Sequence, residues 1–327
     1  MPGMKVFVTG GTGFIGGHLI DLLQARGDME VSALVRDPRR LKGLAGKRDI
    51  ELLEGDLFSL PSLPSPLDVV FHLAGLTKSV RPDDYYTVNQ KGTASLFRHL
   101  EAGGHRPRVV LLSSLAAAGP SAPGAAVRES DPPRPVSPYG ESKLLGEREA
   151  QAFAERIPVT ILRVGPVYGP GDEDFLVYFK YVLKGFMPLF GRQEQAVTLC
   201  YVGDLVRAMD ACLRPDLAAG EIFNIGDSRP ATWREFGRTA GALLGTRPRP
   251  VCVPPWIAGL AAAAVETSSR IARKPAPFNR SKCRDMSQPG WVADVSKARE
   301  LLGFRTEYTL EEGLRETIAW YRRERRL

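Results

Sequence analysis

Cysteine is scarce in this chain, with four among 327 residues. The spacings of Cys200, Cys212, Cys252 and Cys283 match no metal-binding or redox motif. Four cysteines are also too few for the disulfide framework of a small secreted protein. We therefore expect reduced thiols, a cytoplasmic location and no metal site.

Long apolar runs are also missing. The most apolar segment, WIAGLAAAAV at 256–265, has about half of the roughly 20 residues that a membrane-spanning helix needs, so we expect no integral membrane segment. Basic residues follow it, which leaves open a peripheral membrane contact of a helix over 256–274, beside a buried or substrate-lining helix. The N-terminus has neither the apolar stretch nor the cleavage site of a signal peptide.

The charge balance singles out no macromolecular partner. The formal net charge is +7, but the basic residues are spread along the chain, with the densest runs at 36–40 and 322–326. This pattern favours a solvated basic surface over a nucleic-acid surface. We expect a small-molecule substrate and no nucleic acid.

Short apolar runs alternate with helical patterns through the first half of the chain. The runs are rich in Val, Ile and Leu without polar alternation, which is typical of strands buried on both faces of a parallel sheet. The pattern predicts an α/β fold with a doubly wound, Rossmann-like parallel sheet. The predicted strands are Lys5–Thr9, Val31–Arg36, Ile50–Glu54, Val69–Leu73, Arg108–Ser113 and Val159–Arg163.

The alternation of strand and helix patterns ends after Arg163, where Pro and Gly cluster in VGPVYGPGD. We expect residues 1–165 to form a dinucleotide-binding domain, with 198–219 packing back onto it. Residues 166–197 and 220–327 then form a smaller, mostly helical substrate-binding domain.

A glycine-rich turn follows the first predicted strand. Gly10, Gly13 and Gly16 have the spacing G-x-x-G-x-x-G between that strand and a predicted helix. Because glycine lacks a side chain, backbone N–H groups there can approach a pyrophosphate. The helix also directs the positive end of its dipole at that phosphate. The turn predicts a dinucleotide site, with a merely tight strand–helix turn as the alternative.

The end of the second strand, VSALVRDP, indicates which dinucleotide binds. A carboxylate there would bind the ribose diol of NAD, but the place holds Val35 followed by Arg36. A guanidinium pairs with a 2′-phosphate through two hydrogen bonds. We therefore expect NADP rather than NAD, although the adjacent Asp37 keeps a solvated basic loop as the alternative.

Two further strand ends are expected at the cofactor. Asp56 in GDL is placed to accept a hydrogen bond from the adenine amino group, or else to cap a helix. The motif HLAG at 72–75 brings small residues to a strand end where the cofactor would pass closely, as a tight turn would also do.

Tyr139 and Lys143 lie four residues apart in SPYGESK and so share one face of a predicted helix. A neighbouring ammonium favours the phenolate, so we expect Lys143 to lower the pKa of Tyr139 from about 10. Such a phenol can exchange the proton of a carbinol while hydride moves to or from nicotinamide. Ser113 and Ser114 end the fifth strand, where a serine hydroxyl can orient the same oxygen.

With these motifs together, the chain resembles the extended short-chain dehydrogenase/reductases of the NAD(P)-dependent epimerase/dehydratase family. The matching motifs are TGGTGFIG, GDL, HLAG, VNQKGT, SS…G, YGESK, LRVGPVYGPGD and YVGDLVRAM, which extend over most of the chain. The resemblance implies that Tyr139 is the acid/base, that Lys143 holds the nicotinamide ribose, and that Ser114, five residues before Gly119, binds the reacting oxygen. It also implies a homodimer, since members of the family often pair helices of the cofactor domain.

The resemblance places further residues at the cofactor or the substrate. Asn89 in VNQKGT matches a helix asparagine near the active site, with a plain cap or surface amide as the alternative. Lys78 and Arg192 are expected at the substrate. The other residues expected at the cofactor are Thr12, Phe14, Ile15, Leu57, Leu73, Ala74, Gly75, Ser113, Pro166 and Val167.

Departures from the family pattern narrow the substrate. Leu115 and Ala116 stand where the sugar dehydratases carry Asp-Glu, which excludes that route. Val197 stands where many nucleotide-sugar enzymes carry an arginine that clamps the diphosphate. The segments DFLVYFKYVLKGFMPLF and PPWIAGLAAAAV favour a bulky, largely apolar substrate, unless their aromatic residues only form core.

Three functions follow from these patterns. The first is an NADP-dependent oxidoreductase acting on a secondary alcohol or ketone. The second is a nucleotide-sugar epimerase or reductase with tightly bound NAD. The third is a regulatory NAD(P)-binding protein without turnover, which the retained Tyr139 and Lys143 disfavour.

Overall fold

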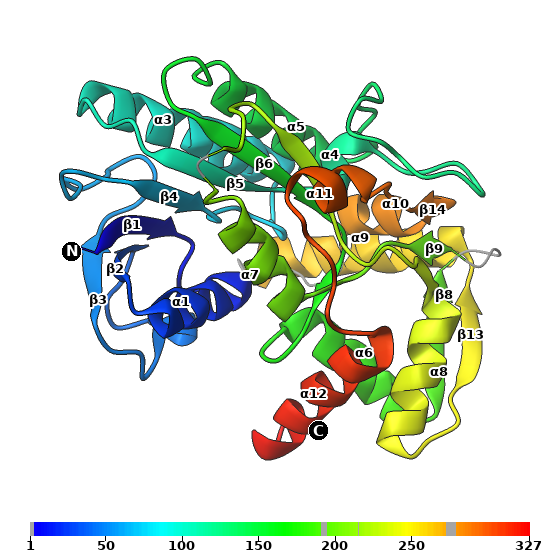
Figure 1. The fold of residues 1–327 in the computed structure, drawn as a ribbon. Coiled ribbons are helices and arrows are strands. Elements are labelled where there is room, and N and C mark those ends of the chain that lie inside the picture. Colours follow the sequence, from blue (N-terminus) through cyan, green and yellow to red (C-terminus); the bar gives the residue numbers. More distant parts are fainter. Residues whose placement is uncertain (1–2, 191–194, 215, 273–278) are drawn as a thin grey trace.

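A seven-stranded parallel sheet forms the centre of the computed structural model, which describes residues 3–190, 195–214, 216–272 and 279–327 (Figure 1). The strand order is β11-β6-β5-β4-β1-β2-β3, so the order reverses between β1 and β4. Ligands of such sheets bind at the carboxyl ends of the strands beside this reversal. The strands are β1 (Met4–Thr9), β2 (Met29–Val35), β3 (Ile50–Glu54), β4 (Val69–His72), β5 (Arg108–Ser114), β6 (Val159–Val164) and β11 (Ile222–Ile225).

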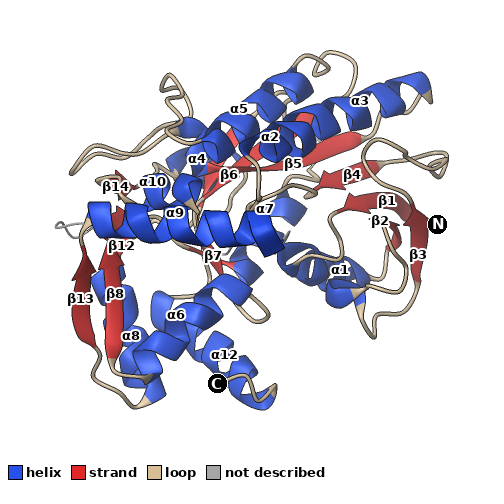
Figure 2. Cartoon of the chain, turned by 180° about the vertical axis from the view of Figure 1, so that it is seen from behind, coloured by secondary structure: helices blue, strands red, loops and turns tan. Residues whose placement is uncertain are grey.

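Helices cover both faces of the sheet, which confirms the predicted doubly wound class. On one face, α1 (Phe14–Arg26) and α7 (Val202–Ala211) pack against the strands through side chains such as Leu19 and Met209. On the other face, α3 (Gly92–Ala102) and α5 (Pro138–Gln151) cover a second core that includes Phe97. Figures 1 and 2 show these helix pairs on opposite sides of the sheet.

A third core lies outside the sheet and joins α6 (Glu173–Leu183), α8 (Trp233–Leu244) and α12 (Leu310–Arg323). Its centre is aromatic: the rings of Phe179 and Phe236 stack with centroids 6.1 Å apart, and Tyr321 packs beside them. Part of the aromatic segment 174–190 is therefore core. Other members of the segment, including Tyr181 and Phe186, are exposed.

The remaining elements connect these layers. Short helices are η1 (Lys42–Leu44), α2 (Pro82–Tyr85), the π-helix η2 (Tyr86–Lys91), α4 (Leu115–Ala118), α10 (Arg280–Met286) and α11 (Ser296–Leu301), and the long α9 spans Pro255–Ala272. Short strands are β7 (Val167–Tyr168), β8 (Phe186–Phe190), β9 (Ala196–Val197), β10 (Cys200–Tyr201), β12 (Ala231–Thr232), β13 (Arg249–Val253) and β14 (Gly290–Trp291).

The expected domain boundary at residue 220 is wrong for β11. This strand pairs in parallel with β6 and buries Phe223 and Ile225 in the sheet, so it extends the cofactor half of the molecule. Leu302 and Phe304, which follow α11, belong to the same core. Within 198–219, the helix α7 shares that core with β1.

Within the described ranges, none of the helices combines the length and the apolar character needed to pass through a lipid bilayer.

Candidate active site

The glycine turn after β1 is shaped by contacts that exclude side chains. Gly10 has a φ of +77°, and a Cβ there would lie 2.7 Å from the backbone nitrogen of Ala74. A Cβ on Gly16 would lie 2.3 Å from the carbonyl oxygen of Gly10. These two glycines allow β1, α1 and the HLAG turn to meet closely.

Gly13, unlike Gly10 and Gly16, leaves open space at the start of α1. It is the N-cap of α1, and a Cβ there would meet only the Gly10 oxygen, at 3.2 Å, within 4 Å. No side chain caps this helix end, and its first turn holds no acidic residue. The first N–H groups of α1, from Phe14 onward, have no partner within the helix, and with the helix dipole they suit a pyrophosphate. The turn therefore fits the expected dinucleotide.

The end of β2 carries an exposed arginine beside a paired carboxylate. Arg39 donates to Asp37 at 2.9 Å, and Arg40 lies 3.6 Å from the other carboxylate oxygen. These partners hold the pKa of Asp37 below its usual value. Arg36 is exposed, and it makes no ion pair with the described part of the chain. Of the three basic residues, Arg36 is thus the one without a competing carboxylate.

Asp56 caps a turn. Its Oδ1 accepts hydrogen bonds from the backbone N–H groups of Phe58 at 2.8 Å and Ser59 at 2.9 Å. The structure has a turn here in place of the helix that the capping alternative expected, and the adenine contact stays a prediction for the second carboxylate oxygen. The neighbouring Leu57 is buried.

A buried chain of hydrogen bonds runs from β1 through the end of β4 to η2. Thr9 Oγ1 lies 2.7 Å from His72 Nδ1, His72 Nε2 lies 3.0 Å from Thr93 Oγ1, and Thr93 donates to the Asn89 carbonyl at 2.7 Å. Burial and the nearby Lys143 lower the pKa of His72 to about 3, so the imidazole is neutral. Because Thr93 donates its hydroxyl proton to Asn89, the neutral ring donates to Thr93 from Nε2 and accepts from Thr9 at Nδ1, so the whole chain has one direction.

Asn89 connects the HLAG turn to the catalytic helix. Its Oδ1 accepts from the Leu76 N–H at 2.8 Å, and its Nδ2 donates to Ser142 Oγ at 2.9 Å. The residue lies in the π-helix η2, where a local widening often marks a functional site. Its backbone also packs tightly on α5, because a Cβ at Gly146 would lie 2.4 Å from the Asn89 oxygen. Asn89 is thus a buried connector, which rules out the surface-amide alternative.

Tyr139 lies in the first turn of α5, which Ser137 caps by accepting from the Gly140 N–H at 3.1 Å. Removal of the phenol from water raises the pKa of Tyr139 to about 12, and its interaction with the Ser114 hydroxyl has a smaller, lowering effect. The expectation that Lys143 lowers this pKa is therefore wrong for the chain on its own. The phenol is protonated at neutral pH and can donate to an oxygen placed between it and Ser114.

Lys143 lies one turn further along α5. Its Nζ donates to the Leu112 carbonyl on β5 at 2.6 Å, and a Cβ at Gly75 would lie 3.7 Å from the same nitrogen. Burial lowers the pKa of Lys143 to about 8, against a smaller opposing effect of Glu147. The amine thus lies beside the HLAG turn, on the face of α5 that Tyr139 shares.

The side chain of Ser113 points into the protein. It is buried and donates to Glu147 Oε1 at 2.5 Å. Glu147 in turn forms a buried ion pair with Arg163, at 2.7 Å. This cluster holds β5, α5 and β6 together, so the side chain of Ser113 has a structural partner, and only its backbone is available for the expected cofactor contact.

Two residues that no sequence pattern indicated approach Tyr139 from other segments. Tyr85 makes an edge contact with its ring, with centroids 5.9 Å apart, and accepts a hydrogen bond from Asn279 at 3.0 Å. Asp285 on α10 accepts from Ser137 at 3.1 Å, while its Oδ1 is buried without a partner in the described residues. Burial raises the pKa of Asp285 to about 6, and its charge raises that of Tyr139.

The predicted substrate residues have mixed outcomes. Lys78 donates to Asp174 on α6, and Lys282 on α10 pairs with the other oxygen of that carboxylate at 2.7 Å. Lys78 thus ties the HLAG loop to the helical part. Arg192 lies outside the described residues. Pro166 and Val167 follow β6 directly, and the Pro166 carbonyl accepts from the Cys200 N–H at 3.1 Å.

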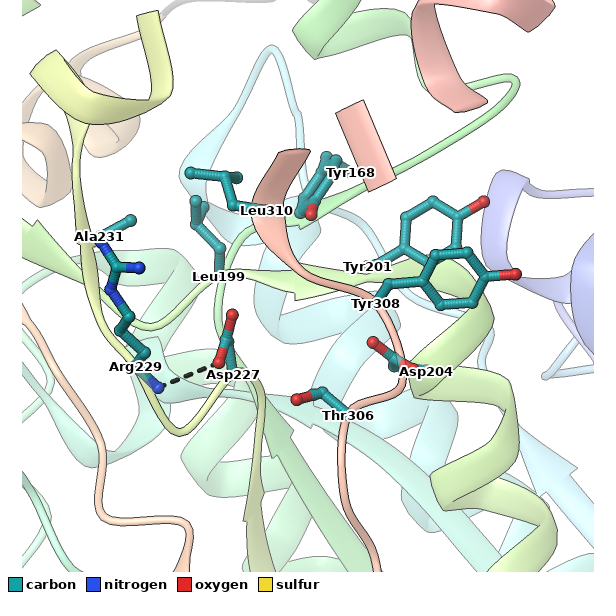
Figure 3. Close-up of a pocket in the computed structure, with 10 residues that line it drawn as sticks. All are labelled: Tyr168, Leu199, Tyr201, Asp204, Asp227, Arg229, Ala231, Thr306, Tyr308 and Leu310. Carbon is teal, nitrogen blue, oxygen red and sulfur yellow. Dashed lines mark hydrogen bonds between the residues drawn. The ribbon is translucent and has the colours of Figure 1, made fainter. Parts of the chain in front are cut away.

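A small pocket in the helical part is separate from this site (Figure 3). The rings of Tyr201 and Tyr308 lie 4.4 Å apart, and Asp227 accepts from the Arg229 N–H at 2.9 Å. None of its lining residues is among the predicted site residues. They are Tyr168, Leu199, Tyr201, Asp204, Asp227, Arg229, Ala231, Thr306, Tyr308 and Leu310.

The class of protein follows from the fold and this site. The sheet is parallel and carries an open glycine turn, and the adjoining strand and helix hold Ser114, Tyr139 and Lys143. These features define an NAD(P)-dependent enzyme of the extended short-chain dehydrogenase/reductase type. The model of the NAD dependent epimerase/dehydratase family matches residues 6–226. The chain belongs to this family.

Similar proteins show the range of the family. A ceramide reductase of Caulobacter vibrioides is 29% identical over 97% of this chain and 94% of its own. A decarboxylating sterol-4-alpha-carboxylate 3-dehydrogenase of Schizosaccharomyces pombe is 28% identical over 100% of both chains. The structure of MoeE5 with UDP-glucuronic acid and NAD has a TM-score of 0.78 and 30% identity, covering 98% of this chain and 99% of MoeE5. Each similarity includes the helical part as well as the sheet.

We predict that alanine substitutions at Gly13 and Gly16 act differently. Gly13 has a φ of −81°, which alanine tolerates, so Gly13→Ala should leave the thermal midpoint unchanged. Its methyl group would occupy the space at the helix end, and calorimetry should show NAD(P)H binding weakened about tenfold or more. Gly16→Ala should lower the thermal midpoint, because its Cβ would clash with the Gly10 oxygen. Undiminished NAD(P)H binding by Gly13→Ala would contradict the placement of the dinucleotide.

Asp285→Asn should change the pH profile of the enzyme. Charged Asp285 raises the pKa of Tyr139, so the neutral amide should lower it. Oxidation of an alcohol needs the phenolate, so the rising limb of kcat/KM against pH should move to lower pH, by up to about one unit. The control is Asp216→Asn, an exposed carboxylate of another segment. A limb that keeps its position, or moves to higher pH, would show that Asp285 does not act on Tyr139.

Proposed function

We propose that the chain is an NADP-dependent oxidoreductase that interconverts a ketone and a secondary alcohol on a bulky, largely apolar substrate. The observation that carries this proposal is a half-buried, protonated Tyr139 whose phenol interacts with the Ser114 hydroxyl, with Lys143 on the same helix face. This arrangement can orient a carbonyl oxygen and supply the proton that the oxygen takes up.

The roles of the residues follow from their positions. In the reducing direction, Ser114 and Tyr139 donate hydrogen bonds to the carbonyl oxygen, and the Tyr139 proton moves to that oxygen as the carbonyl carbon accepts a hydride. The bound NADPH supplies that hydride. Lys143, with a pKa of about 8, is mostly charged at neutral pH and stabilises the phenolate that remains.

Arg36 supports NADP over NAD. Its guanidinium is exposed directly after β2. The pairing register of β1 and β2 places the last residues of β2 beside the end of β1, where the glycine turn begins. A 2′-phosphate can form two charge-assisted hydrogen bonds with such a group. Asp37, which would repel that phosphate, is already paired with Arg39 and Arg40.

The apolar substrate is supported by the residues beside the site. Leu115 and Ala116 are buried where dehydratases carry acids, and Val197 is buried where an arginine would clamp a diphosphate. Two full-length relatives are named for the reduction of ceramide and the dehydrogenation of a sterol carboxylate, both lipids. We also propose a cytoplasmic location, which four free thiols support, and a homodimer, which the family resemblance supports.

A nucleotide-sugar epimerase with tightly held NAD is the second candidate. It is supported by MoeE5, whose structure contains UDP-glucuronic acid and NAD and is similar over nearly its whole length. Epimerisation uses the same hydride and proton transfers twice on one bound sugar. It requires the protein to retain NAD and to bind a charged diphosphate.

One pair of measurements separates the two candidates. The small molecules released on denaturation are identified by mass, and NADPH and NADH oxidation is then followed with a panel of steroid ketones and long-chain keto amides. The proposal expects NADPH-dependent turnover of an apolar ketone. Released NAD, together with calorimetric binding of a UDP-sugar and no ketone turnover, would instead establish the epimerase.

We predict that Arg36→Ala weakens NADPH binding selectively. Loss of a bidentate phosphate contact should raise the dissociation constant for NADPH about 10- to 100-fold and leave that for NADH within about twofold. Arg39→Ala is the matched control, since that arginine pairs with Asp37. An equal loss of affinity for NADPH and NADH, or no loss for either, would exclude Arg36 as the phosphate ligand.

A further inference from the structure

Exposed large apolar side chains are concentrated in two segments of the chain. Of the eleven such side chains in the described ranges, eight lie within 177–186 and 251–260. Isolated exposed apolar residues are normal, but a cluster marks an interaction surface. The eight residues are Val177, Tyr181, Leu183, Phe186, Val251, Trp256, Ile257 and Leu260.

Strand pairing joins the two segments into one face. β8 and β13 are parallel, with Phe186 opposite Arg249 and Val251 opposite Pro188. Met187 faces α8, because a Cβ at Gly237 of that helix would lie 2.6 Å from the Met187 side chain. Side chains alternate along a strand, so Phe186 and Val251 point away from α8. Figure 2 shows α9, α6 and the β8–β13 pair on the same side of the molecule.

The first part of α9 has an apolar outer stripe. Ala258 and Ala262 are buried and pack with Cys283 of α10. Trp256 and Leu260, at the helical spacing of four, are 67% and 65% exposed. Residues 250–265 contain no charged side chain. This helix thus packs its small residues inward and presents its large apolar residues to the outside.

Within the two segments that form this apolar face, the charged side chains are all basic. Lys180, Lys184, Arg247 and Arg249 are exposed, and the segments 177–186 and 246–261 contain no acidic residue. None of the four forms an ion pair within the described ranges. Apolar and aromatic side chains inserted at the headgroup level, with Lys and Arg beside them, are the arrangement that binds anionic bilayers.

A second copy of the chain fits this face poorly. In a two-fold dimer the same patch meets itself, so the four cations of one copy would face the four of the other. Like charges brought together at an interface oppose association. An anionic partner has the complementary charge.

We propose that this face, defined by the eight apolar residues and the four basic ones, docks the enzyme on the surface of an anionic lipid bilayer. Trp256, Ile257 and Leu260 enter the headgroup region, and the four cations contact lipid phosphates. The inference rests on exposure and charge and does not depend on the proposed substrate or cofactor.

The test is co-sedimentation of the full chain with vesicles of phosphatidylcholine alone or with about 30% phosphatidylglycerol, at low and high salt. We expect binding to the anionic vesicles that weakens with salt. Two double variants should each reduce the partition coefficient about tenfold or more. One combines Trp256→Ser with Leu260→Ser, and the other combines Lys180→Glu with Lys184→Glu. Circular dichroism should show unchanged folding, since all four side chains are exposed.

Matched control variants distinguish binding through this face from nonspecific hydrophobic or electrostatic binding elsewhere on the surface. Phe58→Ser with Leu301→Ser removes apolar side chains of similar exposure elsewhere, and Arg106→Glu with Arg323→Glu removes two exposed cations elsewhere. Both should bind as the wild type does. Absence of binding, equal loss in patch and control variants, or a patch-dependent dimer in light scattering would each overturn the proposal. The last outcome would assign the face to a second copy.

Discussion

A single buried chain of hydrogen bonds holds the two halves of the active site together. It begins at Thr9, next to the glycine turn, passes through neutral His72 and Thr93, and reaches Asn89, which donates to Ser142 on the catalytic helix. A buried polar group that loses its partner costs about 1–3 kcal/mol, so the movement of one member alone is unfavourable. The glycine turn and the catalytic helix are therefore held in register before a ligand binds.

Local sequence predicts much of this architecture because the determinants are themselves local. Strands buried on both faces need continuous apolar runs, which is why β1, β4 and β6 are visible in the sequence nearly to the residue. The same holds for Gly13 and Gly16, whose nearest neighbours lie within the turn, whereas Gly10 meets Ala74 of the HLAG turn. Helical periodicity likewise predicts that Tyr139 and Lys143 share one face of a helix.

Other features depend on packing between distant segments, which no local pattern encodes. β11 is a short strand whose partner β6 lies far away in the sequence, so the sequence offers no sign that it completes the sheet. The pKa of Tyr139 rises because surrounding segments bury the phenol, an effect that outweighs its neighbours on α5. Asp285 and Tyr85 reach the site from helices whose own sequences carry no catalytic motif.

The central claim is that Tyr139 transfers the proton during hydride transfer. The most direct test is a single-turnover measurement of NADPH oxidation by wild type and Tyr139→Phe with the same ketone, alongside NADPH binding on the same samples. The account predicts binding within about twofold and a transfer rate lower by about 100-fold or more. An unchanged transfer rate with intact binding would contradict it.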